Sequence, residues 1–381
     1  MGRDIVVYEP NMNSSPHSEI NVGLLSVFEL IWEKNTKFFY GDKRHINYLK
    51  IKKNIENWNL INFKTFKYIP LFFLINDLFL IFKMRKIFKK HTRKNTVFVF
   101  LGIMPFSHIY ISRYNKRHKK NILLCLHGQM EAYLKDTKIG ISKNYYRLCK
   151  NVFKEDDDNI KYIVFGESIK ENIKHLFSNE CKIITIDQPY IYPSIRKNID
   201  SKNKITLGFI GRADKTKNIS ELYKLIDILK YYIEKDRIEI KVVGRFNYNI
   251  PLKYERLFTY FTSTVAPEKF QQEINTLDFA ISFTGKEYYR ATPSGTFFDC
   301  VKWEIPLLTL ENDFTNYYFN KYGSMGRSFS DTSQMGLWII DELIQKDTYI
   351  GQIFEIEKSY KRLKDDISIN SLAIKLAEQL K

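Results

Sequence analysis

Short apolar runs alternate with helical patterns along the whole chain of 381 residues. The strand-like runs lie at 4–10, 96–103, 121–127, 162–168, 204–211, 238–244, 278–283 and 306–310. Short apolar strands separated by amphipathic helices are typical of parallel sheets that carry helices on both faces. The alternation therefore predicts an α/β fold.

One polar segment interrupts this alternation. Pro189 and Pro193 exclude a regular helix there, and charged residues follow before the strand pattern resumes. We therefore expect an N-terminal domain at 1–185, a hinge at 186–203 and a C-terminal domain at 204–381, which are ordinary domain sizes.

Local signals predict where some helices begin. Apolar residues recur at helical spacing after Ser220-Glu221, which predicts a helix that begins there. Another is predicted to begin at Ser168, with Glu171 as the second half of a capping box. The sequence leaves open which domain the final helix, at about 368–380, packs on, and the N-terminal domain is one alternative.

The formal net charge of +17 predicts an anionic partner: a membrane lipid, a nucleic acid or a phosphorylated substrate. No known nucleic-acid-binding motif is visible, so we do not expect a nucleic-acid partner. The four cysteines lack the spacing of a metal or redox site, and no cleavable signal is visible. These features favour a cytoplasmic protein with reduced thiols.

An apolar stretch at 69–82 is followed directly by a basic cluster at 83–94, and a second basic cluster lies at 113–120. The apolar stretch is too short to span a bilayer and contains Asn76 and Asp77. An apolar helix with a basic end is typical of an element that lies among lipid headgroups. A core helix with a solvated end is the alternative. We expect an anionic membrane surface as a partner, and a peripheral location on the inner face of the cell membrane.

The loop after the strand at 204–211 contains Arg212 and Lys217 and leads into a helix. Cations are unfavourable beside the positive end of a helix, and a bound anion would reverse that effect. A solvated basic loop is the alternative.

A second loop opens another helix. Ser294 can cap that helix, Gly295 lets backbone N–H groups approach an anion, and Thr296 adds a hydroxyl. Free N–H groups at a helix start bind phosphate well. Asp299, one turn further on, could accept hydrogen bonds from a ribose. An ordinary capped helix is the alternative.

A third loop region contains Gly244 and Arg245, together with the segment 261–270, whose backbone around Val265 could lie along a nucleobase. A plain surface turn is the alternative.

The order of these segments resembles the donor domain of a GT-B glycosyltransferase, of the bacterial surface-polysaccharide and MurG-like kind. The resemblance implies two Rossmann-like domains that face each other across a cleft. It also implies that Arg212 and Lys217, five residues apart, hold the nucleotide pyrophosphate, that the turn at 294–296 contacts the phosphates and that Asp299 binds the ribose. Many members have two glutamates eight positions apart; here Ala291 stands at the first position, and Glu287 could replace the missing acid.

The resemblance extends more loosely to the N-terminal half. It implies that His127, after an apolar strand, faces the donor sugar, whereas a buried structural histidine is the alternative. In the loop after the first strand, His17 and Glu19 are the groups able to take a proton from a sugar hydroxyl. Alternatively, Ser18 caps a helix and His17 is an incidental surface residue.

The function implied is transfer of a sugar from a nucleotide-diphosphate sugar, UDP-linked, to a glycan acceptor, here expected to be lipid-linked. The process would be synthesis of O-antigen, capsule or another bacterial surface polysaccharide. No Asp-x-Asp motif is visible, so neither a metal nor another cofactor is expected. A nucleotide-sugar 2-epimerase of the same fold and a non-catalytic partner subunit with a degraded donor site are the alternatives.

Overall fold

The computed structural model describes residues 3–13, 17–53, 55–64, 73–134, 146–147, 150–155, 157–192, 204–213, 217–287, 290–345 and 350–381. By its internal contacts the chain divides into two units. The first comprises Met1–Ile191, Ala291–Pro293 and Ile367–Lys381, and the second comprises Tyr192–Arg290 and Ser294–Asp366. Residues 193–203 of the expected hinge lie outside the described residues.

The first unit is built on a seven-stranded parallel sheet in the order β3-β2-β1-β4-β5-β6-β7. Its strands are β1 (Asp4–Tyr8), β2 (Thr36–Gly41), β3 (Asn59–Asn62), β4 (Val97–Phe100), β5 (Asn121–Cys125), β6 (Ile160–Phe165) and β7 (Ile183–Ile186). Every residue of β1 and β4 is buried, as continuous apolar strands require when helices cover both faces of a sheet.

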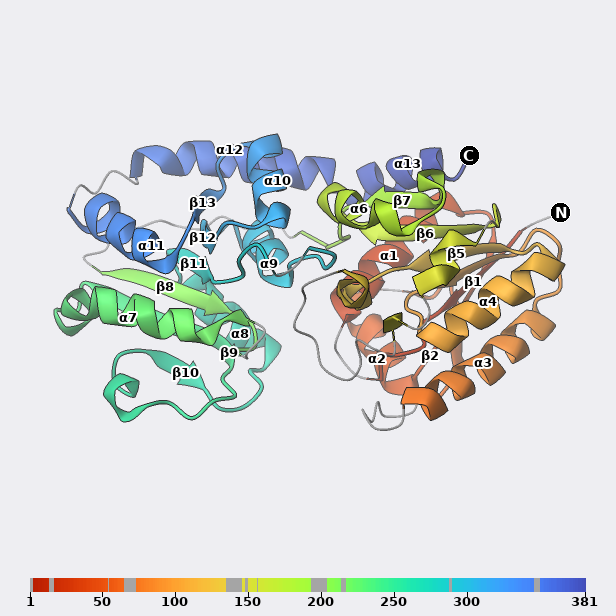
Figure 1. Ribbon diagram of the computed structural model, residues 1–381, viewed down its shortest axis with the longest axis horizontal. Helices are drawn as coiled ribbons and strands as arrows, with labels where there is room; N and C mark the ends of the chain where they lie inside the picture. The colour runs from red at the N-terminus through yellow and green to blue at the C-terminus, as the bar shows by residue number, and fades with distance from the viewer. Residues whose placement is uncertain are drawn as a thin grey trace. The chain divides into compact units, whose positions relative to one another are not determined.

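The helices of this unit are α1 (Ser18–Ile31), α2 (Lys43–Lys52), α3 (Phe73–Lys90), α4 (Pro105–His118), α6 (Glu167–Ile173) and α13 (Ile369–Gln379). Helices α3 and α4 lie side by side over one face of the sheet (Figure 1). Helix α1 packs against α2 and α13, and right-handed crossovers put this group on the other face. Among the described residues, no helix has the length and apolar character needed to cross a bilayer.

The final helix belongs to the first unit. Helix α13 packs on α1 and β7, and the Gln379 side chain both accepts a hydrogen bond from the Thr185 N–H and donates one to the Thr185 carbonyl, each at 2.9 Å. These bonds occupy backbone groups of the edge strand β7 that would otherwise be exposed.

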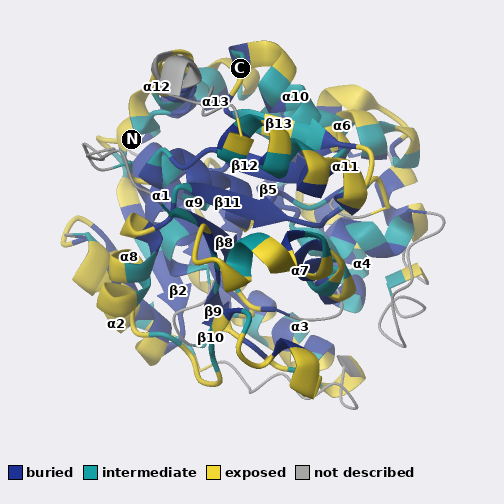
Figure 2. Ribbon diagram, turned by 90° about the vertical axis from the view of Figure 1, so that its left-hand side faces the viewer, coloured by how far each residue is buried: buried dark blue, intermediate teal, exposed yellow. Residues whose placement is uncertain are grey.

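The second unit contains a six-stranded parallel sheet in the order β10-β9-β8-β11-β12-β13. Its strands are β8 (Ile205–Ile210), β9 (Ile238–Arg245), β10 (Thr259–Phe261), β11 (Phe279–Ser282), β12 (Leu307–Leu310) and β13 (Gly326–Phe329). Its helices are α7 (Ile219–Glu234), α8 (Pro267–Asn275), α9 (Gly295–Trp303), α10 (Asp313–Tyr322), α11 (Thr332–Trp338) and α12 (Ile350–Asp366). Figure 2 shows the central strands buried and the exposed residues on the outer sides of the helices.

Short helical turns complete the two units. They are the 3₁₀ segments Gly128–Tyr133, Lys150–Lys154, Lys174–Leu176, Glu180–Lys182 and Leu252–Tyr254, and the π-helical segment Ile339–Gln345.

The α/β fold with parallel sheets is confirmed, whereas the predicted capping box is wrong. Helix α6 begins at Glu167, and its N-cap is Gly166, with φ of 133° and no side-chain capping bond. Because this glycine makes the turn out of β6, Ser168 already lies inside the first helical turn. Glu171 instead pairs with Lys174 at 2.8 Å. Helix α7 begins at Ile219, one residue before the predicted start.

One buried histidine makes the stability of the first unit depend on pH. His108 of α4 is 2% exposed, and its Nε2 lies 3.0 Å from the Tyr162 hydroxyl of β6. Burial lowers the pKa of His108 to about 3. In the unfolded chain a histidine takes up a proton near pH 6.5, so between pH 6.5 and 3 the unfolded state binds more protons. The neutral His108 therefore stabilises the fold fully above pH 6.5, and this contribution is lost as the pH falls.

The free energy of unfolding should decrease as the pH falls from 6 to 4. We expect the slope of this decrease to be smaller in His108→Gln than in the wild type, and the difference between the two slopes to be about 1.4 kcal/mol per pH unit. Urea unfolding followed by circular dichroism measures this slope. His118→Gln, an exposed position on the same helix, is the control and keeps the wild-type slope. Identical slopes in all three proteins would contradict the assignment.

Candidate active site

The strand order of the second sheet reverses between β8 and β11, although all its strands are parallel. From β8 the chain continues to β9 on one side, whereas β11 lies on the other side of β8. The loops that follow β8 and β11 therefore diverge, and ligands of open α/β sheets bind at such a point. The loop after β8 carries Arg212 and Lys217, and the chain after β11 leads to α9.

The side chain of Lys217 reaches the start of α9. Its Nζ donates to the Thr296 hydroxyl at 3.1 Å and to the Ile210 carbonyl at 3.2 Å. Gly211 makes this path possible, because its φ is 94° and a Cβ there would lie 2.8 Å from the Lys217 Nζ. The structure thus joins two of the predicted site residues, Lys217 and Thr296.

The first turn of α9 keeps free donors next to this ammonium. The Ser294 side chain caps the helix by accepting the Phe297 N–H at 3.2 Å. The N–H groups of Gly295 and Thr296 lie in the first turn of α9, and no carbonyl within the helix is available to accept hydrogen bonds from them. No heavy atom lies within 4 Å of where a Cβ on Gly295 would stand. Open space, N–H donors and a cation therefore meet at the positive end of the helix, where an anion is favoured.

The other residues predicted for the donor site lie around this edge in separate segments. Arg212, Arg245 and Glu287 are exposed, whereas Val265 and Asp299 are half-buried. Gly244 has a φ of 150°, and any Cβ at this position would lie 2.3 Å from the Gly211 carbonyl oxygen, so a larger residue would clash. The close approach of the chain after β8 to the end of β9 explains that residue.

In the first sheet, the strand order reverses between β1 and β4. A pair of histidines lies at this end of the sheet. His17 stands between β1 and α1 and has a left-handed backbone with φ of 61°, which is rare outside glycine and often marks a functional site. Its ring centroid lies 5.0 Å from that of His127, which follows β5. His127 Nε2 donates to the Leu101 carbonyl, after β4, at 2.8 Å.

Both histidines are neutral at neutral pH. Burial, reinforced by the neighbouring His17, lowers the pKa of His127 to about 3. Burial also lowers the pKa of His17, while the charge of Glu9 opposes that change. A neutral imidazole can accept a proton, so His17 has the protonation state of a general base.

Sequence reasoning missed Glu9, a buried acid whose charge acts on His17. Its carboxylate is 1% exposed; Oε1 accepts the Asn11 N–H and Oε2 the Asn21 side-chain amide, both at 2.9 Å. The Asn21 amide also lies 2.9 Å from His45 Nε2. The available signal was an acidic residue directly after an apolar strand, at the edge of a parallel sheet where sites form.

Glu19, a candidate base from the sequence, and Glu131, which follows His127 in the chain, both have structural partners. Glu19 forms an ion pair with Lys52 of α2. Glu131 accepts the N–H of Ala291, a residue of the first unit, at 2.7 Å. Ser18 is the first helical residue of α1 and not its cap, because His17 occupies the N-cap position.

No model of a known protein family matches the sequence, and no curated protein matches it. Similar solved structures do exist. A glycosyltransferase from Rickettsia africae is 13% identical, with a TM-score of 0.63, over 100% of this chain and 99% of that one. UGT89C1 of Arabidopsis thaliana in complex with quercetin is 10% identical, with a TM-score of 0.56, over 100% and 98%.

The chain has the GT-B fold. The GT-B resemblance predicted from the sequence is therefore confirmed for the fold. A further structure with this fold is S. aureus TarM, in a G117R mutant complex that contains UDP; it is 16% identical, with a TM-score of 0.58 over 80% of this chain. The chain spans 59% of the length of TarM.

The open space before α9 gives a direct test of the anion site. Gly295→Ala places a methyl group there without a clash, so we expect unchanged or slightly higher stability, by up to about 1 kcal/mol. The same methyl group would obstruct an anion at the helix start, so affinity for UDP should fall about 10-fold or more. Thermal unfolding and calorimetric titration measure the two effects. Wild-type UDP affinity in Gly295→Ala would argue against a phosphate at this turn.

Proposed function

We propose that the chain transfers a sugar from a UDP-linked sugar to a glycan acceptor. The observation that carries this proposal is the Lys217 ammonium at the first turn of α9, where it hydrogen-bonds Thr296 at 3.1 Å. The GT-B fold adds support, because structures with this fold include TarM with UDP and UGT89C1 with UDP-L-rhamnose.

The second unit would bind the donor. The diphosphate would accept hydrogen bonds from Lys217 and from the N–H groups of Gly295 and Thr296, with Arg212 as a further cation. Negative charge grows on the diphosphate as the bond to the sugar breaks, and fixed donors stabilise that charge best. We propose that these groups serve in place of a metal ion, and that Asp299 binds the ribose.

The first unit would act on the acceptor. A hydroxyl oxygen of the acceptor forms the new bond to the anomeric carbon, and the nucleoside diphosphate leaves with the electron pair of the old bond. His17 takes the proton of that hydroxyl, since burial keeps its imidazole neutral. Glu9 stabilises the imidazolium that results, and the Leu101 carbonyl holds the ring of His127 beside it.

The acceptor we propose is lipid-linked, and the process is the synthesis of a bacterial surface polysaccharide at the inner face of the membrane. The exposed basic residues of α3 and α4 support this location.

Product analysis tests the function against its two alternatives. Purified chain with UDP-sugars and lipid-linked acceptors is expected to release UDP only when both substrates are present, also in the presence of EDTA. Conversion of the sugar without an acceptor would indicate a 2-epimerase. Tight UDP binding without any turnover would indicate a non-catalytic subunit.

The pH profile tests the role of His17. Because its pKa is lowered from 6.5, the acidic limb of kcat/KM should lie below pH 6.5. Glu9→Gln removes the charge that raises this pKa, so the limb should move to lower pH, and His17→Gln should reduce kcat about 100-fold or more. Glu19→Gln is the control and keeps the profile. If the acidic limb of kcat/KM lies at the same pH in Glu9→Gln as in the wild type, His17 is excluded as the base.

A further inference from the structure

The exposed face of α3 changes from apolar to basic along its length. Large apolar side chains are exposed in the first half of the helix: Leu74, Ile75, Leu78, Phe79 and Phe82. Basic side chains are exposed on the same face of the second half: Arg85, Lys86, Lys89 and Lys90. Exposed apolar residues that are contiguous on one helix face mark an interaction surface.

A groove lies where the basic half of α3 meets α4. It has a volume of about 670 Å³, and it is lined by Arg85, Phe88, Lys89, Tyr110, Arg113, Tyr114, Lys116, Arg117 and His118. Glu155 pairs with Lys116 at 3.0 Å, but Arg85, Lys89 and Arg117 have no acidic partner among the described residues. The groove therefore carries an excess of positive charge that favours an anionic ligand.

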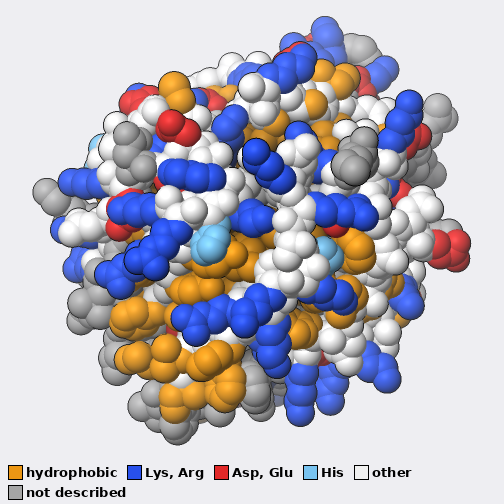
Figure 3. All heavy atoms as spheres, turned by 90° about the vertical axis from the view of Figure 1, so that its right-hand side faces the viewer, with side chains coloured by type: hydrophobic (Ala, Val, Ile, Leu, Met, Phe, Trp, Pro, Cys, Tyr) orange, Lys and Arg blue, Asp and Glu red, His pale blue; other side chains and the backbone are white. Residues whose placement is uncertain are grey.

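Aromatic rings line this groove. Tyr114 stacks on Phe88 with ring centroids 4.5 Å apart and on His118 at 4.1 Å. The Arg85 guanidinium lies over the Tyr110 ring at 5.3 Å, and a cation is attracted to the face of an aromatic ring. Figure 3 shows basic side chains next to hydrophobic ones on this side of the first unit.

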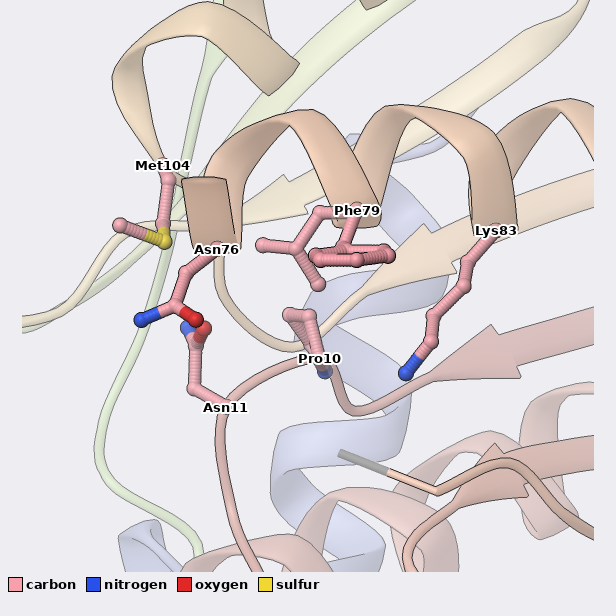
Figure 4. Close-up of a pocket in the computed structure, with 7 residues that line it drawn as sticks. Pro10, Asn11, Asn76, Phe79, Lys83 and Met104 are labelled. Atoms are coloured by element: carbon pink, nitrogen blue, oxygen red, sulfur yellow. The ribbon is translucent and has the colours of Figure 1, made fainter. Parts of the chain in front are cut away.

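The apolar half of α3 lies next to the loop that carries the proposed base. Asn76 and Phe79 line a small pocket of about 30 Å³ together with Pro10 and Asn11, which follow β1 (Figure 4). His17 belongs to the same connection between β1 and α1. A surface that covers the apolar half of α3 would therefore lie close to the acceptor side of the first unit.

We propose that this face, the exposed side of α3 with the α3–α4 groove, docks on a membrane that contains anionic phospholipid. The apolar half of α3 enters the acyl region, and the groove binds a lipid phosphate. A free phosphate or a polyanion would need the groove alone, whereas a bilayer also accounts for the adjoining apolar residues. The inference deepens the proposed function, on which it rests, by naming the surface that meets a lipid-linked acceptor.

Vesicle flotation tests the basic groove with the full chain and without nucleotide. The vesicles contain phosphatidylcholine alone, or phosphatidylcholine with 30% phosphatidylglycerol. We expect binding to the anionic vesicles and about a 100-fold loss in Arg85→Gln/Arg113→Gln/Arg117→Gln, since each cation near an anionic surface strengthens binding about fivefold. The matched control Lys224→Gln/Lys230→Gln/Lys253→Gln removes three exposed cations of the second unit and should bind as the wild type does.

Equal losses in the two triple variants would overturn the proposal, because the attraction would then depend only on net charge. Loss of binding to inorganic phosphate or heparin, with vesicle binding intact, would also overturn it and indicate a different ligand for the groove.

Fluorescence tests the apolar half. Leu78→Trp should be quenched by anionic vesicles with lipids brominated on their acyl chains, whereas Leu252→Trp, an exposed position of the second unit, should not. Equal quenching in both variants, or none in Leu78→Trp, would exclude insertion of α3. UDP binding is measured separately, so failure of the docking face and failure of the proposed sugar transfer are distinguishable.

Discussion

The hydrogen bond from the Lys217 ammonium to the Thr296 hydroxyl joins the loop after β8 to the first turn of α9. These segments follow β8 and β11, the strands between which the strand order of the second sheet reverses. A cation is unfavourable at the positive end of a helix, and a bound anion there would offset that effect. A Cβ on Gly211 would lie 2.8 Å from the Lys217 Nζ, and a Cβ on Gly244 would lie 2.3 Å from the Gly211 carbonyl oxygen. This arrangement fits the anion that we propose at the start of α9.

In the first unit, His17, the base that we propose, stays neutral although the buried carboxylate of Glu9 acts on it. Burial lowers the pKa of His17, and the Glu9 carboxylate limits that change while its own charge is held by Asn11 and Asn21. A group prepared in this way accepts a proton readily and is stabilised once it carries one. In the proposed function, the second unit would supply donors for a leaving diphosphate, and the first unit would supply a base for a hydroxyl.

Much of the fold could be predicted because buried parallel strands leave a clear apolar signal, as at β1 and β8. The strands β2, β3, β10 and β13 escaped notice because they are short or partly polar, and β7 because its apolar run merges into the proline-rich segment after it. In the site, Lys217 and Thr296 could be found because small residues and cations at a helix start have a physical meaning. Glu9 has only one signal in the sequence, its place directly after an apolar strand, because its burial and its effect on His17 arise from tertiary structure.

Calorimetric titration of UDP measures most directly whether Lys217 and the start of α9 hold a diphosphate, as we propose. A charge-assisted hydrogen bond is worth about 1.5–3 kcal/mol, so Lys217→Ala should weaken UDP binding about 10- to 100-fold. Lys230→Ala, an exposed lysine on α7 paired with Glu234, should leave the affinity unchanged. Equal affinity in the wild type and both variants, or no binding of UDP to the wild type, would contradict the account.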